Sequence, residues 1–230
     1  MNLIPDKNLF LVTSAIKPLN SVFFTDEQRM QQTIDTLISI RKKVPKSIIV
    51  LAEASFNPLS EDEKIKLQQF TNGYIDLSRQ PDVKGFSGLK LKSQAETALL
   101  FHSLMPLKHQ PFMREVKRIF KFSGRTILDD SFNLSDYDGL FGKYVFKKRI
   151  PTWMPRALYG ASDLLITRMY SFCPSLIDNY LEVLGKNFDL LEHMDTEHAH
   201  FVNIPKKYLI EFDTIHCTGW LSGNGQIEKY

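Results

Sequence analysis

The residues that point most directly to chemistry lie in the stretch 118–132. Residues 119–122 are strand-forming, and Ser123-Gly124-Arg125 then interrupts the strand with a small, flexible and cationic corner before 126–128 resume it. Backbone N–H groups, a glycine and a guanidinium at one corner suit an anion such as a diphosphate. An ordinary turn with one surface arginine explains the same residues, so the corner alone leaves both interpretations open.

Two acidic residues near the carboxyl end are candidate bases. Asp195 and Glu197 stand in Met194-Asp-Thr-Glu-His-Ala-His200, inside a helix predicted over about 189–203. A carboxylate there could deprotonate an acceptor hydroxyl group. A solvated helix face produces the same pattern, and without other observations it is the preferred interpretation.

The first elements of the chain predict how such groups are positioned. Residues 8–14 form an apolar run that ends in the hydroxyls of Thr13 and Ser14, as expected of a buried parallel strand whose carboxyl end opens onto a site. A capping box of Thr25 and Gln28 opens a helix to about residue 43, and residues 47–53 form a second buried strand. Strand, helix and strand in about 45 residues predict a right-handed βαβ unit.

Glu53 ends the second of these strands. In doubly wound sheets an acidic side chain at this place commonly meets a ribose, whereas an exposed loop carboxylate is the equally weighted alternative.

The middle of the chain continues the α/β alternation. Ser60 and Glu63 form a second capping box, residues 74–77 a third strand, and the polar segment 78–92 a mobile loop. Ser93 and Glu96 have the spacing of a third capping box, which opens a helix to about residue 104. This spacing already explains Glu96, so we prefer a capping role for it over a site role.

The last third is predicted from turn and cap residues. Strands are expected at 144–146 and 164–170, a helix at 174–184 between Pro174 and a C′ glycine at Gly185, and strand-like segments from 208 with a hairpin turn at Asn224-Gly225. The fold class is therefore α/β, with a mostly parallel central sheet flanked by helices.

Composition excludes several classes of protein. The chain has 230 residues, 43% hydrophobic and 24% charged, which fits one α/β domain. The net charge of +3 permits an anionic ligand but makes nucleic-acid binding through 147–149 or 41–43 unlikely. Two cysteines provide no disulfide framework, and neither a secretory signal nor a membrane span is visible, so we expect a cytoplasmic protein.

Several common site motifs are absent from the sequence. The P-loop, the Gly-x-Gly-x-x-Gly fingerprint and the Gly-x-Ser-x-Gly elbow do not occur. His193, His198 and His200 have spacings that do not place all three on one helical face, so a zinc site is not favoured.

The order of the motifs resembles that of poorly characterised GT-A-type glycosyltransferase-like proteins of phages and bacteria, across most of the chain. The resemblance lies in Thr13-Ser14, Arg29-Met-Gln-Gln-Thr33, Leu37-Ile-Ser-Ile40, Phe120-Lys-Phe-Ser-Gly-Arg125 and Gly219-Trp-Leu-Ser-Gly-Asn-Gly225. It implies a single GT-A-like domain, with a nucleotide-sugar-binding half over about 1–130 and an acceptor and catalytic half over about 131–230. It also implies a nucleotide-sugar donor, a glycan or other hydroxyl acceptor, and the cytoplasm of a bacterium or an infected host cell.

The sequence departs from the family pattern at the corner. Many GT-A enzymes carry there an Asp-x-Asp that holds Mn²⁺ or Mg²⁺ against the diphosphate, whereas this chain has Ser123-Gly124-Arg125. Dependence on Mn²⁺ or Mg²⁺ is therefore in doubt, since a guanidinium can neutralise a diphosphate without a metal. Asp129 and Asp130, three residues further on, are weak candidates for a displaced metal site.

The resemblance assigns the remaining roles. Donor-binding candidates are Thr13, Ser14, Arg29, Glu53, Lys121, Ser123, Gly124 and Arg125, and catalytic candidates are Glu197 and Asp195. The alternative is a catalytically inactive binding or structural protein on a transferase-like fold. Such a protein would also be expected to lack the Asp-x-Asp.

Overall fold

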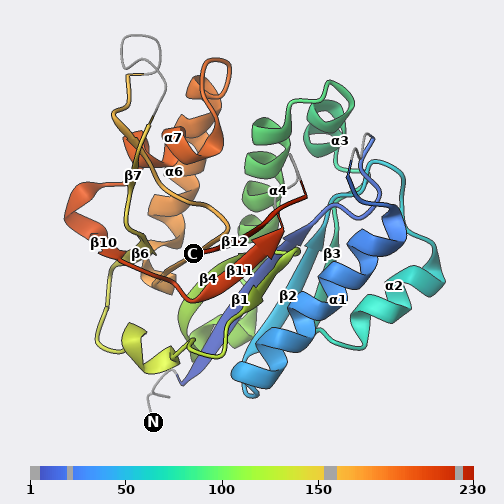
Figure 1. The fold of residues 1–230 in the computed structure, drawn as a ribbon, viewed down its shortest axis with the longest axis horizontal. Coiled ribbons are helices and arrows are strands. Elements are labelled where there is room, and N and C mark those ends of the chain that lie inside the picture. The colour runs from blue at the N-terminus through green and yellow to red at the C-terminus, as the bar shows by residue number, and fades with distance from the viewer. Residues whose placement is uncertain (1–5, 20–22, 153–159, 221–224) are drawn as a thin grey trace.

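The fold is built on a central sheet of seven strands (Figure 1). The computed structural model describes residues 6–19, 23–152, 160–220 and 225–230. In spatial order the strands are β10 (Leu209–Phe212), β6 (Tyr144–Lys147), β9 (Met169–Phe172), β4 (Val116–Ser123), β1 (Lys7–Ser14), β2 (Ile48–Glu53) and β3 (Gly73–Asp76). All neighbours pair in parallel except β9, which is antiparallel to both β4 and β6. The mostly parallel α/β sheet predicted from the sequence is confirmed.

Helices and a second sheet cover the two faces of this central sheet. The helices are α1 (Asp26–Lys43), α2 (Glu61–Gln68), α3 (Pro81–Gly88), α4 (Lys92–Leu107), α6 (Ile177–Leu190) and α7 (Thr196–Asn203). Short 3-10 turns lie at Pro111–Glu115, Leu134–Tyr137, Pro174–Leu176 and Lys206–Tyr208. A three-stranded sheet is formed by β12 (Ile227–Lys229), β11 (Cys217–Trp220) and β5 (Thr126–Leu128), and β7 (Ile150–Pro151) pairs with β8 (Asp163–Leu164).

Alternation along β1 divides the core into two layers. Leu9 and Leu11 belong to the layer that also contains the buried residues of α4 and α6, whereas Phe10 and Val12 belong to the layer of α1 and the small sheet. Successive side chains of a strand point to opposite faces, and all four are 0–1% exposed, so both faces of the strand are covered. This double burial explains the continuous apolar run in the sequence.

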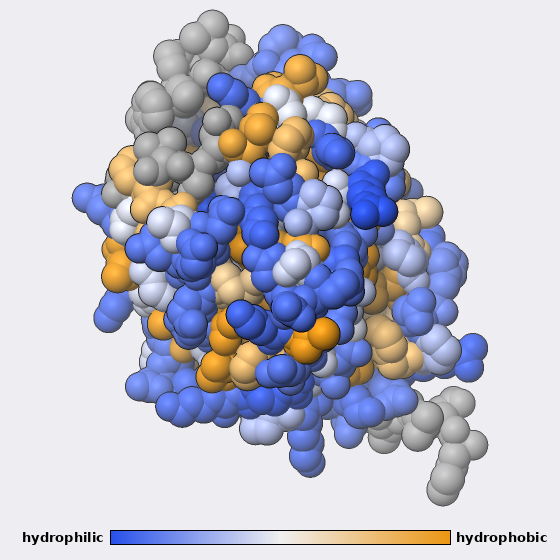
Figure 2. Space-filling model, turned by 90° about the vertical axis from the view of Figure 1, so that its right-hand side faces the viewer, coloured by the Kyte–Doolittle hydropathy of each residue, from blue (hydrophilic) through white to orange (hydrophobic). Residues whose placement is uncertain are grey.

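The two first helices are fixed by the capping boxes expected from the sequence. The Thr25 side chain accepts from the backbone N–H of Gln28, and Ser60 accepts from that of Glu63, with the reciprocal bond present in both cases. The side of the molecule that lies at the right of Figure 1 is mainly hydrophilic, with apolar residues in small separate groups (Figure 2). Ile38 of α1 and Ile65 of α2 are about half exposed.

The prediction for segment 78–104 was wrong in two respects. The expected mobile loop contains α3, which Pro81 begins at its first position. Helix α4 begins at Lys92 with Leu91 as its N-cap and no side-chain cap bond, so Ser93 lies inside the first turn. The Ser93–Glu96 capping box therefore does not form. The Glu96 carboxylate accepts a hydrogen bond from Lys121 instead.

Three element bounds in the last third also differ from prediction. The single strand expected at 164–170 is divided between β8 and β9. Helix α6 continues through Gly185 to Leu190, because burial of its apolar face offsets the roughly 1 kcal/mol that a glycine costs inside a helix. The helix expected over 189–203 is interrupted, and Asp195 is the N-cap of α7.

The carboxyl-terminal hairpin is confirmed as an antiparallel pair. Strands β11 and β12 pair from Thr218 with Lys229 to Trp220 with Ile227, and Gly225 has the positive φ of +71° that suits a turn. Asn224 lies outside the described residues. Across the described ranges, no helix combines the length and apolar character needed to cross a bilayer.

A buried polar network joins α6, α7 and β9. The hydroxyl groups of Tyr170 and Tyr180 are hydrogen-bonded, and the Tyr180 hydroxyl lies 2.9 Å from His200 Nε2. His200 Nδ1 donates to the Thr196 carbonyl oxygen at 2.8 Å. Burial lowers the pKa of His200 from 6.5 to about 4, so the imidazole is neutral in the folded protein.

Acidification is expected to destabilise the fold through His200. Between pH 6.5 and 4 only the unfolded chain binds a proton at this histidine, so the free energy of unfolding falls as the pH falls. A pKa difference of about 2.5, at 1.36 kcal/mol per unit, corresponds to roughly 3 kcal/mol. Urea unfolding across this pH range should show a flatter dependence in His200→Gln, but not in the exposed control His193→Gln. Equal slopes in all three proteins would contradict a buried neutral imidazole.

Candidate functional site

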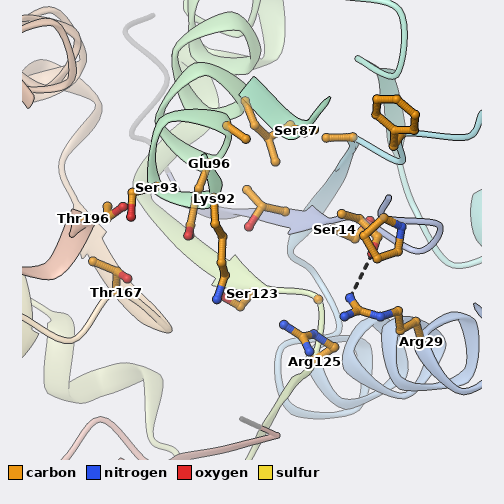
Figure 3. Close-up of a pocket in the computed structure, with 18 of the residues that line it drawn as sticks. Ser14, Arg29, Ser87, Lys92, Ser93, Glu96, Ser123, Arg125, Thr167 and Thr196 are labelled. Carbon is orange, nitrogen blue, oxygen red and sulfur yellow. Dashed lines mark hydrogen bonds between the residues drawn. The ribbon is translucent and has the colours of Figure 1, made fainter. Parts of the chain in front are cut away.

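A cavity of about 630 Å³ opens at the carboxyl ends of β1, β2 and β4 (Figure 3). Because the three strands are parallel, the residues that follow each of them meet at one edge of the sheet. Thr13 and Ser14 come from β1, Ala54 follows β2, and Ser123, Gly124 and Arg125 come from the end of β4. The opposite walls are formed by the beginning of α4, the loop between β8 and β9, and the beginning of α7.

The corner after β4 is held tightly against β1. The Gly124 N–H donates to the Thr13 carbonyl oxygen at 2.8 Å, and the Ser123 N–H donates to the Arg168 carbonyl oxygen at 2.9 Å. A Cβ atom at position 124 would lie 3.0 Å from Ser14 Cβ and 3.1 Å from the Thr13 oxygen. Glycine is therefore required by the close approach of two backbones.

Five cationic side chains line the cavity. They are Arg29 of α1, Lys90 just before α4, Lys92 of α4, Arg125 of the corner and Arg168 of the β8–β9 loop. Arg29 Nη1 donates to the Ala15 carbonyl oxygen at 3.1 Å, which fixes its guanidinium beside the end of β1. The sequence resemblance had indicated Arg29 and Arg125, whereas Lys90, Lys92 and Arg168 were missed.

Arg125 is the most constrained of these cations. Its Nη1 atom is buried and has no hydrogen-bond partner within the described ranges. Burial, together with the charges of Arg29 and Arg168, lowers its pKa to about 10. A buried donor without a partner, surrounded by like charges, is stabilised by an anionic ligand.

Two of the expected carboxylates also line the cavity. Glu197 Oε1 accepts from the Thr167 hydroxyl at 3.0 Å, and burial raises the pKa of Glu197, with Glu96 and Asp195 adding to the rise. Asp195 Oδ1 caps α7 and contacts His198 Nδ1 at 2.7 Å. Glu197 is therefore the better placed of the two candidates for a base, since the Asp195 carboxylate already caps α7 and contacts His198.

Lys121 lies behind the cavity wall rather than on it. Its side chain is 2% exposed, and its ammonium donates to Glu96 Oε1 at 2.7 Å, to Ser123 Oγ at 3.1 Å and to the Thr167 carbonyl oxygen at 2.8 Å. An ammonium has three N–H donors, so these contacts use all of them. Lys121 can support the corner but has no donor left for a ligand.

Glu53 was expected to meet a ribose but is 1% exposed and does not line the cavity. Its carboxylate accepts from the Ser14 hydroxyl, from the Ile16 N–H at 3.1 Å and from the Ser55 N–H at 2.9 Å. Glu53 therefore orders the loops that follow β1 and β2, and its effect on a ligand would pass through Ser14.

The two weak metal candidates lie apart from the cavity. Asp129 Oδ1 accepts from the Thr218 hydroxyl at 2.7 Å, and the nearly fully exposed Asp130 forms an ion pair with Lys43 at 2.6 Å. No group of three or more His, Cys, Asp or Glu side chains is placed to hold a metal ion in the part of the chain that the structure describes. The cavity wall near the corner carries guanidinium groups, which do not bind a divalent cation, so this donor set does not fit Mn²⁺ or Mg²⁺.

Substitution of Gly124 tests the close packing at the corner. Gly124→Ala should lower the free energy of unfolding by roughly 1–3 kcal/mol, because the new methyl group meets the backbone of Thr13. Gly85→Ala is the matched control, since position 85 has open space and lies within α3, where alanine is favoured. Urea denaturation measures both. Equal stability of the two variants would contradict the backbone contact.

The chain is similar in fold to three solved glycosyltransferase structures. They are the galactosyltransferase LgtC in complex with donor and acceptor sugar analogues (9% identity, 88% of this chain and 72% of that chain, TM-score 0.58), mouse xyloside xylosyltransferase 1 in its apo form (10%, 90% and 85%, 0.51), and core-mannan synthase A from Aspergillus fumigatus in its Mn/GDP form (10%, 90% and 73%, 0.50). No protein-family model and no curated protein matches the sequence. At such low identity the likeness concerns the fold, which is that of GT-A-type glycosyltransferases.

Proposed function

We propose that the chain transfers a sugar from a nucleotide-sugar donor to a hydroxyl group of a glycan or another acceptor. The observation that carries the proposal is Arg125, which lines the cavity of a glycosyltransferase-like fold and whose buried Nη1 has no hydrogen-bond partner among the described residues. The cavity lies at the carboxyl ends of parallel strands, where α/β folds bind nucleotides.

The donor's diphosphate would be bound by guanidinium groups rather than by a metal ion. Arg29 and Arg125 flank the end of β1, and Gly124 holds the corner closely against Thr13 and Ser14. Guanidinium groups bind phosphate oxygens through two parallel hydrogen bonds and stabilise the charge that develops on a leaving diphosphate. The unsuitable donor set for Mn²⁺ or Mg²⁺ at the corner supports this metal-independent arrangement.

The polarity of the cavity suggests how the donor is oriented. The side formed by Thr13, Ala54 and Phe56 is partly apolar and suits a nucleoside. The other side carries hydroxyl and carboxyl groups, among them Thr196 and Glu197, which suit a sugar. The Thr196 hydroxyl is buried and has no hydrogen-bond partner among the described residues, so a sugar hydroxyl could supply one.

Glu197 is the proposed base of a direct displacement. Its carboxylate takes the proton of the acceptor hydroxyl while the acceptor oxygen forms a bond to the anomeric carbon of the donor sugar. The bond from that carbon to the phosphate oxygen breaks, and the nucleoside diphosphate leaves with the bonding electrons. The guanidinium groups of Arg29 and Arg125 then hold the leaving group's negative charge.

Arg125→Ala should bind the donor roughly 10- to 100-fold more weakly, because a charge-assisted hydrogen bond contributes about 1.5–3 kcal/mol. Calorimetric titration with UDP-, GDP- and CMP-sugars in the presence of EDTA identifies the donor and measures the change. Arg114→Ala is the matched control, since Arg114 is an exposed arginine just before the opposite end of β4.

The same titration separates the enzyme from its alternative. Binding of one donor in EDTA, lost in Arg125→Ala and kept in Arg114→Ala, supports the proposal. Binding that appears only when Mn²⁺ is added would refute metal independence. No binding of any donor at millimolar concentration would favour a protein that keeps only the transferase fold.

Glu197→Gln should reduce kcat by roughly 10²- to 10⁴-fold and leave the donor's dissociation constant nearly unchanged, because the amide keeps the shape but cannot accept a proton. In the wild type, kcat should fall as the pH decreases through the raised pKa of Glu197, since only the ionised carboxylate accepts the proton. Transfer measured by release of the nucleoside diphosphate checks both. Unchanged turnover in Glu197→Gln would exclude it as the base.

A further inference from the structure

The Lys121 ammonium, whose three N–H donors are all used in hydrogen bonds, connects three walls of the cavity. Lys121 donates to Glu96 of α4, to Ser123 of the corner and to the carbonyl oxygen of Thr167 in the β8–β9 loop. These segments are far apart in the sequence, and each of them carries a cavity-lining residue. We name the set Glu96, Lys121, Ser123 and Thr167 the Lys121 clamp.

The clamp reaches the proposed base by one more hydrogen bond. The hydroxyl of Thr167, whose carbonyl oxygen is held by Lys121, donates to Glu197 Oε1 at 3.0 Å. Thr167 is 4% exposed, so its side chain has little freedom. In addition, the Leu165 N–H donates to the Glu197 carbonyl oxygen at 3.2 Å, which ties the same loop to the start of α7.

Glu96 differs from the other members because it faces both the clamp and the cavity. Its side chain is 26% exposed, whereas that of Lys121 is 2% exposed. Burial alone would raise the pKa of Glu96, but the Lys121 ammonium, with the charges of Lys92 and Arg168, lowers it to about 2, so the carboxylate remains ionised at ordinary pH. The cavity therefore contains one permanently charged carboxylate near a second one that can titrate.

A purely structural purpose explains this arrangement poorly. Desolvation of a buried ion pair often cancels its attraction, so apolar residues of similar size would stabilise the fold as well. Ionic groups at this point instead place a fixed negative charge beside the reaction space and hold the loop that contacts the base.

We propose that Glu96 and Thr167 are positioning residues for Glu197: Thr167 orients its carboxylate, Glu96 strengthens it as a proton acceptor, and Lys121 fixes both partners. The proposal rests on the proposed function of Glu197 as a base. It assigns a catalytic consequence to Glu96, which the sequence pattern attributes to a helix cap.

Other charged residues near Glu197 also affect its titration. Asp195 precedes it on α7, Lys92 lies on α4 with Glu96, and Arg168 follows Thr167 in the loop. Asp195 and Glu96 disfavour the ionised form of Glu197, whereas the hydrogen bond from Thr167 favours it. Removal of Glu96 and removal of the Thr167 hydroxyl should therefore shift the titration of Glu197 in opposite directions.

Carboxyl ¹³C NMR of protein labelled at glutamate measures this titration in the free protein, with Glu197→Gln identifying the resonance. In Glu96→Gln, which keeps a hydrogen-bond acceptor for Lys121, the Glu197 midpoint should fall by about 0.5–1 pH unit. In Thr167→Val, which leaves the carbonyl contact with Lys121 intact, it should rise by a similar amount. Glu61→Gln, on the exposed outer side of α2, should leave it unchanged.

The outcome is decisive whether or not a donor is found. Opposite shifts in the two variants, repeated in the acidic limb of the kcat–pH profile, support the proposal. Unchanged midpoints, or shifts in the same direction, would overturn it, and Thr167→Val provides the test if Glu96→Gln does not fold. Because the titration needs no ligand, the two proposals can fail separately. Donor binding without the opposite shifts would refute the positioning roles alone. Opposite shifts without binding of any donor would refute the proposed function alone.

Discussion

The whole site depends on the contact between two backbones at the ends of β4 and β1. The Gly124 N–H meets the Thr13 carbonyl oxygen at 2.8 Å, and no side chain could stand between them. At this point the chain leaves the central sheet, and only Gly124 and Arg125 separate β4 from β5 of the small sheet. The change of sheet leaves the Arg125 guanidinium in the cavity, while its carbonyl oxygen accepts from the Trp220 N–H at 3.0 Å.

The corner carries positive charge, in contrast to a site that binds its anionic ligand through a metal ion. A metal-dependent site needs carboxylates to hold the cation, and the cation then holds the diphosphate. Here Arg29, Arg125 and Arg168 would supply positive charge directly, and each comes from a different segment. Burial and the repulsion from Arg29 and Arg168 both lower the pKa of Arg125, and an anionic ligand would offset both effects.

The sequence predicted those parts of the site that follow from local pattern. Thr13, Ser14 and the 123–125 corner were located because they end apolar strands, and parallel pairing brings such ends together. Arg168 was missed because it reaches the cavity only through the antiparallel pairing of β9 with β4, which no local signal encodes. Glu53 has the expected position on its strand, but the hydrogen bonds that surround its carboxylate were not visible in the sequence.

Glu96 shows most clearly why spacing alone is insufficient. The Ser93–Glu96 pattern is a valid capping signal, yet α4 begins two residues too early for Ser93 to be the N-cap. Once the cap is lost, the position of Glu96 on the helix directs it toward β4, where the buried Lys121 needs a counter-ion. The pairing of a local helix start with a distant strand residue therefore decides whether this carboxylate belongs to a helix end or to the site.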